Sequence, residues 1–140
     1  MSRVDHWEGV YATRAAHEVG WYQVRPETSL QLIAKLGIRP DDAIIDVGGG
    51  ASNLVDHLVA GGFRHLTVLD ISSAAIAAVK VRLGDDADTV KWIAGDISET
   101  RPPGPYRLWH DRAVFHFLTA PGQRAIYVAG LRAALPTGGY

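Results

Sequence analysis

A run of glycines beside an aspartate is the feature of this sequence best suited to chemistry. Gly48, Gly49 and Gly50 follow a short apolar segment that contains Asp46. Glycine tolerates positive φ and lets a ligand approach the backbone closely. In parallel α/β sheets, ligands bind beyond the carboxyl ends of the strands. The glycine run is therefore a candidate ligand-binding loop.

Two further aspartates fall at corresponding places in the chain. Asp70 ends the next apolar segment, 20 residues after Gly50, which is the spacing at which an acidic residue binds ribose hydroxyls. Asp96 lies at the end of the third such segment. Aspartates at the ends of three successive predicted strands indicate a ligand that contains a nucleoside.

The local pattern narrows the choice of nucleoside ligand. The dinucleotide fingerprint G-x-G-x-x-G would need glycine at position 53, where the chain has Asn53. The negative charge of Asp46 would repel a pyrophosphate, and it favours a ligand that carries an ammonium group. No G-K-[ST] follows, which excludes a P-loop. A nicotinamide-dependent oxidoreductase is disfavoured and stays open as an alternative.

His110 and Asp111 close a fourth predicted strand on the same side. Histidine titrates near neutral pH, so either residue is a candidate for proton transfer. Neighbouring strand residues point to opposite faces, so the two are not expected to act together. No His, Asp or Glu set has metal-ligand spacing on one helix, and we predict no metal.

Alternating strand-like and helix-like segments must position these residues. Apolar, β-branched runs predict strands, and helical periodicity with capping residues predicts helices. This alternation predicts an α/β fold with a Rossmann-like, doubly wound parallel sheet, after an N-terminal helical region. The strands are expected over 43–47, 65–71, 90–97 and 106–112, and the main helices over 27–36, 53–60, 74–83 and 119–135.

These motifs resemble those of the class I S-adenosylmethionine-dependent methyltransferases. Asp46, Gly48 and Gly50 match the family's acidic residue followed by alternate glycines, and Asp70 and Gly95-Asp96-Ile97 match its next two motifs. Ser52 stands where a third glycine is common. The resemblance implies S-adenosylmethionine as cofactor, S-adenosylhomocysteine as product, and methyl transfer by in-line displacement.

The resemblance also implies roles for individual residues. The glycine loop would surround the methionine part of the cofactor, Asp70 would bind the ribose, and Asp96 would approach the adenine amino group. His110-Asp111-Arg112 looks like the motif below the sulfonium, so His110 and Asp111 are the catalytic candidates. The cofactor-binding residues that the resemblance implies are Asp46, Gly48, Gly49, Gly50, Asn53, Asp70, Ile71, Asp96, Ile97, His110 and Arg112.

The aromatic residues near the N-terminus resemble the lid of methyltransferases that act on small molecules. Trp7 and Tyr11 are four residues apart and would share one helix face, with Trp21 and Tyr22 close behind. They would either pack against the core or cover the cofactor, whose cationic sulfonium is attracted to aromatic faces. We expect one domain over 1–140, with a helical lid over 1–26 and an α/β core over 27–140.

Composition limits the partners. The chain has 140 residues, no cysteine and a formal net charge of −1, which argues against a nucleic-acid or anionic-membrane coat protein and excludes thiolate chemistry. Without a long apolar run or secretory leader, the expected location is cytoplasmic. A small-molecule acceptor is the expected partner. A module that binds the cofactor without turnover remains an alternative.

The C-terminal end leads to a further expectation. The sheet of the resembled family has the strand order 3-2-1-4-5-7-6, and this chain supplies the first four strands. Residues 136–140 look like the turn into a fifth strand. We therefore expect a C-terminally truncated domain whose fourth strand is an open edge, and a homodimer that pairs through it.

Overall fold

The central sheet consists of parallel strands, as the sequence predicts. The computed structural model describes residues 2–13 and 25–140. Within them lie β1 (Ala43–Val47), β2 (His65–Asp70), β3 (Val90–Ala94) and β4 (Leu108–Asp111). The sheet order is β3-β2-β1-β4, and each neighbouring pair is parallel. The predicted α/β class and the strand order 3-2-1-4 are confirmed.

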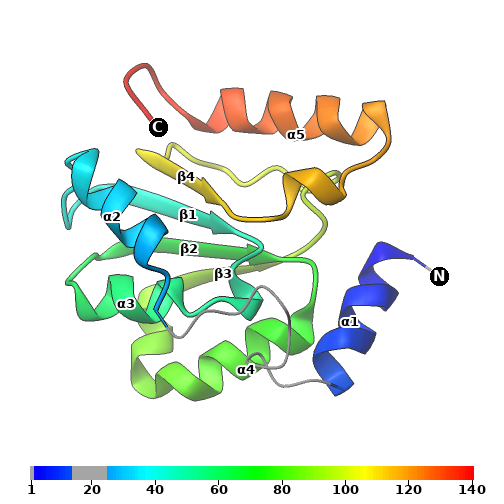
Figure 1. Cartoon of the computed structure of the whole chain (residues 1–140), viewed down its shortest axis with the longest axis horizontal. Helices are drawn as coiled ribbons and strands as arrows, with labels where there is room; N and C mark the ends of the chain where they lie inside the picture. The colour runs from blue at the N-terminus through cyan, green and yellow to red at the C-terminus, as the bar shows by residue number, and fades with distance from the viewer. Residues whose placement is uncertain (1, 14–24) are drawn as a thin grey trace.

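Helices cover both faces of this sheet (Figure 1). α2 (Glu27–Lys35), α3 (Leu54–Ala60) and α4 (Ser73–Leu83) pack on one face, and α5 (Pro121–Ala134) packs on the other. α1 (Arg3–Thr13) lies beyond the carboxyl ends of the strands, against the N-terminal end of α4. The arrowheads of the strands point toward α1, so this helix covers the edge where ligands bind in such sheets.

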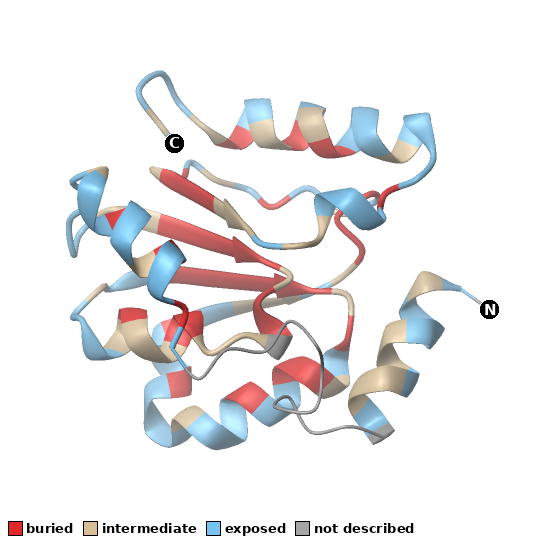
Figure 2. Ribbon diagram, viewed as in Figure 1, coloured by how far each residue is buried: buried red, intermediate tan, exposed pale blue. Residues whose placement is uncertain are grey.

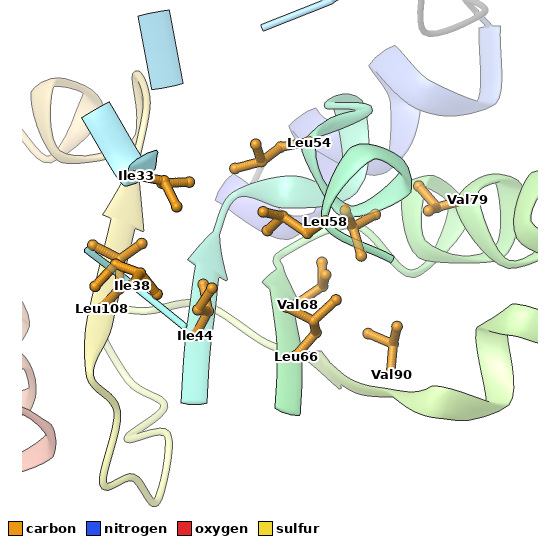
Figure 3. Close-up of a cluster of buried hydrophobic side chains, with 11 residues drawn as sticks. Ile33, Ile38, Ile44, Leu54, Leu58, Leu66, Val68, Val79, Val90 and Leu108 are labelled. Atoms are coloured by element: carbon orange, nitrogen blue, oxygen red, sulfur yellow. The ribbon is translucent and has the colours of Figure 1, made fainter. Parts of the chain in front are cut away.

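The central strands β1 and β2 are buried on both faces because helices cover both faces of the sheet. Ile44 and Ile45 are adjacent on β1 and enter opposite layers of the core, since successive side chains alternate across a strand. Figure 2 shows β1 and β2 almost continuously buried and β3 and β4 only partly buried, whereas α1 is half-buried or exposed along its length. Figure 3 shows the first layer, which includes Ile33, Ile38, Ile44, Leu54, Leu58, Leu66, Val68, Val79, Val90 and Leu108.

The second layer ties α5 to β4. Trp109 donates a hydrogen bond from Nε1 to the Tyr127 hydroxyl at 2.8 Å, and the two rings pack edge to face. Both side chains are buried, so the hydrogen bond satisfies two polar groups that would otherwise be costly. The contact between Trp109 and Tyr127 therefore fixes the position of β4 relative to α5.

Three strands are shorter than predicted, and β2 loses only its last predicted residue, Ile71. β3 ends at Ala94, so Asp96 lies in the following turn rather than on the strand. β4 begins at Leu108 instead of residue 106, after a segment whose prolines cannot donate backbone hydrogen bonds. α3 begins one residue late, at Leu54, because Gly49–Ala51 forms a short 3-10 turn first. Ser72 caps α4 by accepting a hydrogen bond from the amide of Ala75 at 3.1 Å.

The outer edge of β4 carries the start of a further pairing. Tyr140 donates from its backbone N–H to Arg107 and accepts from the N–H of Trp109, at 2.9 and 2.8 Å. This pattern is that of parallel strand pairing. Self-association through this edge stays a prediction. Within the described residues, no helix has the length and apolar character needed to cross a membrane.

Candidate cofactor-binding and active site

A pocket opens at the carboxyl edge of the sheet, below α1. Eight of the residues predicted to bind a cofactor line it: Asp46, Gly48, Asn53, Asp70, Ile71, Ile97, His110 and Arg112. Trp7 and Tyr11 of the predicted lid line it as well, and Arg3 joins them from the same helix. The predicted lid residues Trp21 and Tyr22 lie outside the described residues.

The other two glycines of the loop lie behind the pocket and make room for the carboxylates. A Cβ on Gly49 would lie 2.5 Å from Oδ2 of Asp46, and one on Gly50 would lie 2.9 Å from the carboxyl group of Asp70. Gly48 reaches the pocket with φ +78°, a value that favours glycine. The glycine run therefore lets the backbone pass close to both buried acids.

Asp70 is held by backbone amides from two sides. Its Oδ2 accepts from Gly50 N–H at 2.9 Å and its Oδ1 from Ser72 N–H at 2.8 Å. Burial raises the pKa of Asp70 to about 6, although these two hydrogen bonds work in the opposite direction, and the charge of Asp46 adds to the rise. The carboxylate is thus fixed in orientation and ionised at neutral pH.

Asp46 has one paired and one unpaired oxygen. Its Oδ1 accepts from Nδ1 of His110 at 2.8 Å, whereas Oδ2 is buried without a hydrogen-bond partner. Nε2 of the same ring is hydrogen-bonded to Oγ of Ser29, also at 2.8 Å. Burial opposes protonation of His110, but the hydrogen bond to Asp46 and its charge outweigh it and raise the pKa of the imidazole.

The carboxylate of Asp96 accepts hydrogen bonds from α1 and from the turn that follows it. Nη1 of Arg3 contacts both carboxylate oxygens, at 2.9 and 3.1 Å. The backbone N–H and hydroxyl of Ser98 donate to Oδ1 at 2.9 and 2.7 Å. Asp96 does not itself line the pocket, although Ile97 does. The predicted contact of Asp96 with an adenine amino group stays a prediction.

Asp111 faces away from the pocket. Its carboxylate accepts from the backbone N–H groups of Val114 and Phe115, at 2.8 and 3.1 Å, and from the hydroxyl of Tyr127 at 2.5 Å. This carboxylate holds the turn that carries Val114 into the pocket wall. The opposite directions of His110 and Asp111 agree with their adjacency on a strand, and the geometry does not bring Asp111 to the predicted catalytic position.

The aromatic side chains of α1 form the outer wall of the pocket. The rings of Trp7 and Tyr11 stack with centroids 6.0 Å apart, and Trp7 meets Phe117 edge to face at 5.3 Å. Glu8 on the same helix accepts from the backbone N–H and hydroxyl of Ser73 and from the N–H of Ala74. A carboxylate at the N-terminus of α4 is favourably placed relative to the helix dipole.

Sequence reasoning missed Ser29, Arg3, Glu8 and Phe117. Ser29 reads as an ordinary helix residue, and its partner His110 is 81 positions away. Arg3 and Asp96 are 93 positions apart. The sequence carries no local signal for such contacts, because they depend on where α1 and α2 pack.

Comparison with known proteins assigns the family. Residues 44–139 match the family model described as a methyltransferase domain. The chain belongs to this family. The predicted class, an S-adenosylmethionine-dependent methyltransferase domain, is thereby confirmed, and S-adenosylmethionine is the cofactor that goes with it.

Two curated relatives of this methyltransferase domain differ in what they modify. A malonyl-[acyl-carrier protein] O-methyltransferase of Anoxybacillus flavithermus is 34% identical over 96 residues, which cover 68% of this chain and 36% of that protein. An eEF1A lysine and N-terminal methyltransferase of Danio rerio is 28% identical over 100 residues, covering 71% of this chain and 14% of that protein. The chain therefore spans about a third or less of these relatives.

Solved structures share the fold. An S-adenosylmethionine-dependent methyltransferase from Clostridium acetobutylicum matches with TM-score 0.71 and 15% identity, covering 99% of this chain and 55% of that one. The glycopeptide N-methyltransferase MtfA, complexed with sinefungin, matches with TM-score 0.68 and 20% identity, covering 80% of this chain and 50% of that one. At these identities the likeness supports the fold of the methyltransferase domain.

Proposed function

We propose that this domain transfers a methyl group from S-adenosylmethionine to a small-molecule acceptor. The observation that carries the proposal is the pocket at the carboxyl edge of the sheet. One wall holds the two buried carboxylates Asp46 and Asp70 beside the glycine turn, and the other is the aromatic face of α1. Such a pocket combines acceptors for a polar, partly cationic nucleoside with an apolar cover.

The residues present fit this cofactor. Oδ2 of Asp46 is buried without a partner, and a buried polar atom left unpaired costs about 1–3 kcal/mol. An ammonium group is the donor that such a carboxylate oxygen lacks. The backbone amides that orient Asp70 occupy one lone pair on each oxygen, which leaves further acceptor capacity for two ribose hydroxyls.

The cofactor supplies an electrophilic methyl group on a sulfonium. The side chains of this domain would bind, orient and shield it. Asp46 and Asp70 hold its polar ends, and the loop at Gly48 admits it close to the backbone. Trp7 and Tyr11 exclude water, which favours a reaction in which charge is dispersed. Positioning of this kind can supply about 7–11 kcal/mol in favourable intramolecular cases.

The hydrogen bonds of His110 bear on its proposed role. Both ring nitrogens are engaged, Nδ1 by Asp46 and Nε2 by Ser29. A general base needs a free nitrogen within hydrogen-bond reach of the acceptor. We therefore propose that His110 orients Asp46 and that the acceptor attacks without a side-chain base from β4.

A protein amine is the second candidate acceptor, because one relative is named for methylating lysine and an N-terminus. The attachment of α1 over the pocket favours the smaller acceptor. Arg3 fastens the start of this helix to Asp96, and Glu8 fastens its middle to the start of α4. We further propose a cytoplasmic location and no nucleic-acid partner, in line with the net charge of −1.

Calorimetry and thermal shift test the cofactor. S-adenosylhomocysteine at 100 times its dissociation constant should stabilise the folded chain by about 2.7 kcal/mol, and NAD should not. The variant D70A should lose most of this stabilisation, whereas R64A, which removes an exposed ion pair with Asp41, should keep it. Stabilisation by NAD but not by S-adenosylhomocysteine would instead support the oxidoreductase alternative.

Radiolabelled S-adenosylmethionine then tests the acceptor. The protein is incubated with a cell extract separated into small-molecule and protein fractions. Label in the small-molecule fraction is the expected result. Label confined to protein would favour the amine acceptor, and cofactor binding without label in either fraction would indicate a module that binds without turnover.

A further inference from the structure

Three side chains from three separate elements form a continuous hydrogen-bonded chain beside the pocket. Oγ of Ser29, on α2, lies 2.8 Å from Nε2 of His110, on β4. Nδ1 of His110 lies 2.8 Å from Oδ1 of Asp46, on β1. The exposed fractions of the side chains of His110 and Asp46 are 15% and 5%, so the hydrogen bond between them is shielded from water. The chain ends at Oδ2 of Asp46, the buried oxygen without a partner.

The order of groups is that of a hydrolytic Ser-His-Asp triad, but the surroundings differ. A nucleophilic serine must face its substrate. Ser29 is 8% exposed. His110 and Asp46 line the pocket, but Ser29 is not among the described residues that do so. The serine therefore stands at the closed end of the chain, and the carboxylate stands at the ligand end.

We propose that Ser29 and His110 are positioning residues that hold the carboxylate of Asp46 at the pocket wall, beside the cationic end of the cofactor, and that the charge on His110 sets the affinity for that end. The proposal rests on the proposed function, since it concerns the same cofactor. It assigns Ser29 a task in cofactor binding although Ser29 does not reach the pocket.

The hydroxyl of Ser29 can hydrogen-bond to His110 whether the imidazole ring is neutral or protonated. When His110 is neutral, Nδ1–H donates to Asp46, and Nε2 accepts the hydroxyl proton of Ser29. When His110 is protonated, Nε2–H donates to the hydroxyl oxygen instead, because a hydroxyl can do either. The pair of His110 and Asp46 carries one negative charge in the first state and none in the second. Only the first state attracts an ammonium group strongly.

The charged groups around His110 set the pH at which this change occurs. Asp46 faces it from β1, and Asp111 and Arg112 adjoin it in sequence, while α2 presents the neutral Ser29. Burial lowers the pKa of His110, but the two carboxylates raise it and prevail over Arg112. His110 should therefore lose its proton at a pH above the ordinary histidine pKa of about 6.5. The titration of Asp70, with a pKa of about 6, lies below it.

Calorimetric titration with S-adenosylhomocysteine between pH 5.5 and 9 tests the proposal. The wild-type affinity should rise with pH in two steps, one from Asp70 and a higher one from His110. H110N keeps an amide donor for Asp46 but does not titrate, so only the lower step should remain. At the upper step the expected change is at least about tenfold, the effect of one charged hydrogen bond.

Variants of Ser29 separate positioning from simple packing. S29A should lower the affinity and shift the upper step, since Nε2 loses its partner, and S29T should restore both by returning a hydroxyl. H65Q replaces an exposed histidine at the far end of β2 and should match the wild type at every pH. Circular dichroism melting of each variant records any loss of stability, which a purely structural role would produce without moving the pH profile.

The wild type alone provides a second readout. In a nitrogen-15 NMR titration, His110 should carry its neutral-state proton on Nδ1, and its pKa should fall when S-adenosylhomocysteine is bound, because an ammonium group beside Asp46 disfavours imidazolium. An unchanged pKa, or identical pH profiles for H110N and the wild type, would overturn the inference. Absence of any S-adenosylhomocysteine binding by the wild type would contradict the proposed function instead.

Discussion

Two buried carboxylates with different environments dominate the site at the scale of single residues. Asp70 receives a backbone amide on each oxygen, whereas Asp46 has a histidine on one oxygen and nothing on the other. Both are buried at 3–4% exposure, so neither interaction is screened by water. Their different partners give Asp70 a fixed hydrogen-bonding direction and leave Asp46 with an unmet need for a donor.

The raised pKa of Asp70 predicts opposite effects of pH on stability and on binding. The folded value of about 6 exceeds the model value of 3.8, so its stabilising contribution is present below about pH 4 and is lost as pH rises through 6. Relative to D70N, the wild type should lose roughly 3 kcal/mol of unfolding free energy between pH 4 and 7. Urea unfolding of both proteins across this range measures the difference.

Cofactor affinity should move the other way, because the ionised carboxylate is the better acceptor for two ribose hydroxyls. D70N should bind S-adenosylhomocysteine at least about tenfold more weakly than the wild type at pH 7.5. A variant with unchanged affinity at pH 7.5 would exclude Asp70 from ribose binding. A pH-independent stability difference would show that its carboxyl group titrates normally.

Gly49 should be intolerant of any side chain. A Cβ there would lie 2.5 Å from Oδ2 of Asp46 and 3.1 Å from a methyl group of Val68. Overpacking of this kind costs typically 1–3 kcal/mol, and moving Asp46 would also weaken cofactor binding. G122A on α5, where nothing lies within 4 Å of the added carbon, is the matched control. Thermal unfolding and calorimetry of both variants should show a loss for G49A alone.

At the scale of elements, α1 is held by side chains at two places rather than by a deep apolar interface. Arg3 bonds to Asp96, and Glu8 accepts from the first residues of α4. The helix is half-buried or exposed, and its aromatic side chains contact the pocket. Elements with few buried apolar contacts open at low free-energy cost. This attachment makes α1 the element whose movement should admit and release ligands.

Loosening α1 should therefore act on release rates. R3A and E8A should each speed dissociation of S-adenosylhomocysteine several-fold, since each removes one attachment. R64A, which breaks an exposed ion pair at the opposite end of the sheet, is the control. Stopped-flow displacement measures the rate constants. If R3A and E8A released ligand at the rate of R64A, α1 would not be the gate.

For the whole molecule, the order of the strands places the site. The order β3-β2-β1-β4 runs outward from β1 in both directions, and the ligand crevice of such sheets lies where the order reverses. Asp46 and Gly48 belong to β1 and its turn, Asp70 to β2 and His110 to β4, so three adjacent strands deliver their carboxyl ends to one pocket. The two faces covered by helices supply the rigidity that keeps these ends together.

The same topology leaves β4 at one edge of the described sheet. Tyr140 pairs with it at Arg107 and Trp109 and shows that this edge accepts a parallel neighbour. Unpaired strand edges associate with other chains. We predict a homodimer formed through β4. Sedimentation velocity at increasing protein concentration should show a monomer–dimer equilibrium, and a monomer at all concentrations would contradict it.

Much of the site was predictable from neighbouring residues. The apolar strands, the glycine turn after β1 and the acids at the strand ends are local patterns, and they predicted the α/β fold, the family and eight pocket-lining positions. Such features are visible in sequence because burial alternates along a strand and positive φ favours glycine. They predicted residues that line the pocket, whereas Asp111, a catalytic candidate only through the family resemblance, has its carboxylate on Tyr127 and on the turn after β4.

Only the tertiary structure decided which side chains act on one another. Asp96 is paired with Arg3 from α1, which is 93 residues away in the sequence. Asp46 is bonded to His110, and His110 is bonded to Ser29 from α2, 81 residues away from it. Contacts at such separations depend on the packing of whole helices against the sheet, and no local pattern encodes that packing. The sequence therefore determined the fold and its ligand edge, while packing determined the hydrogen-bond partners and direction of each acid.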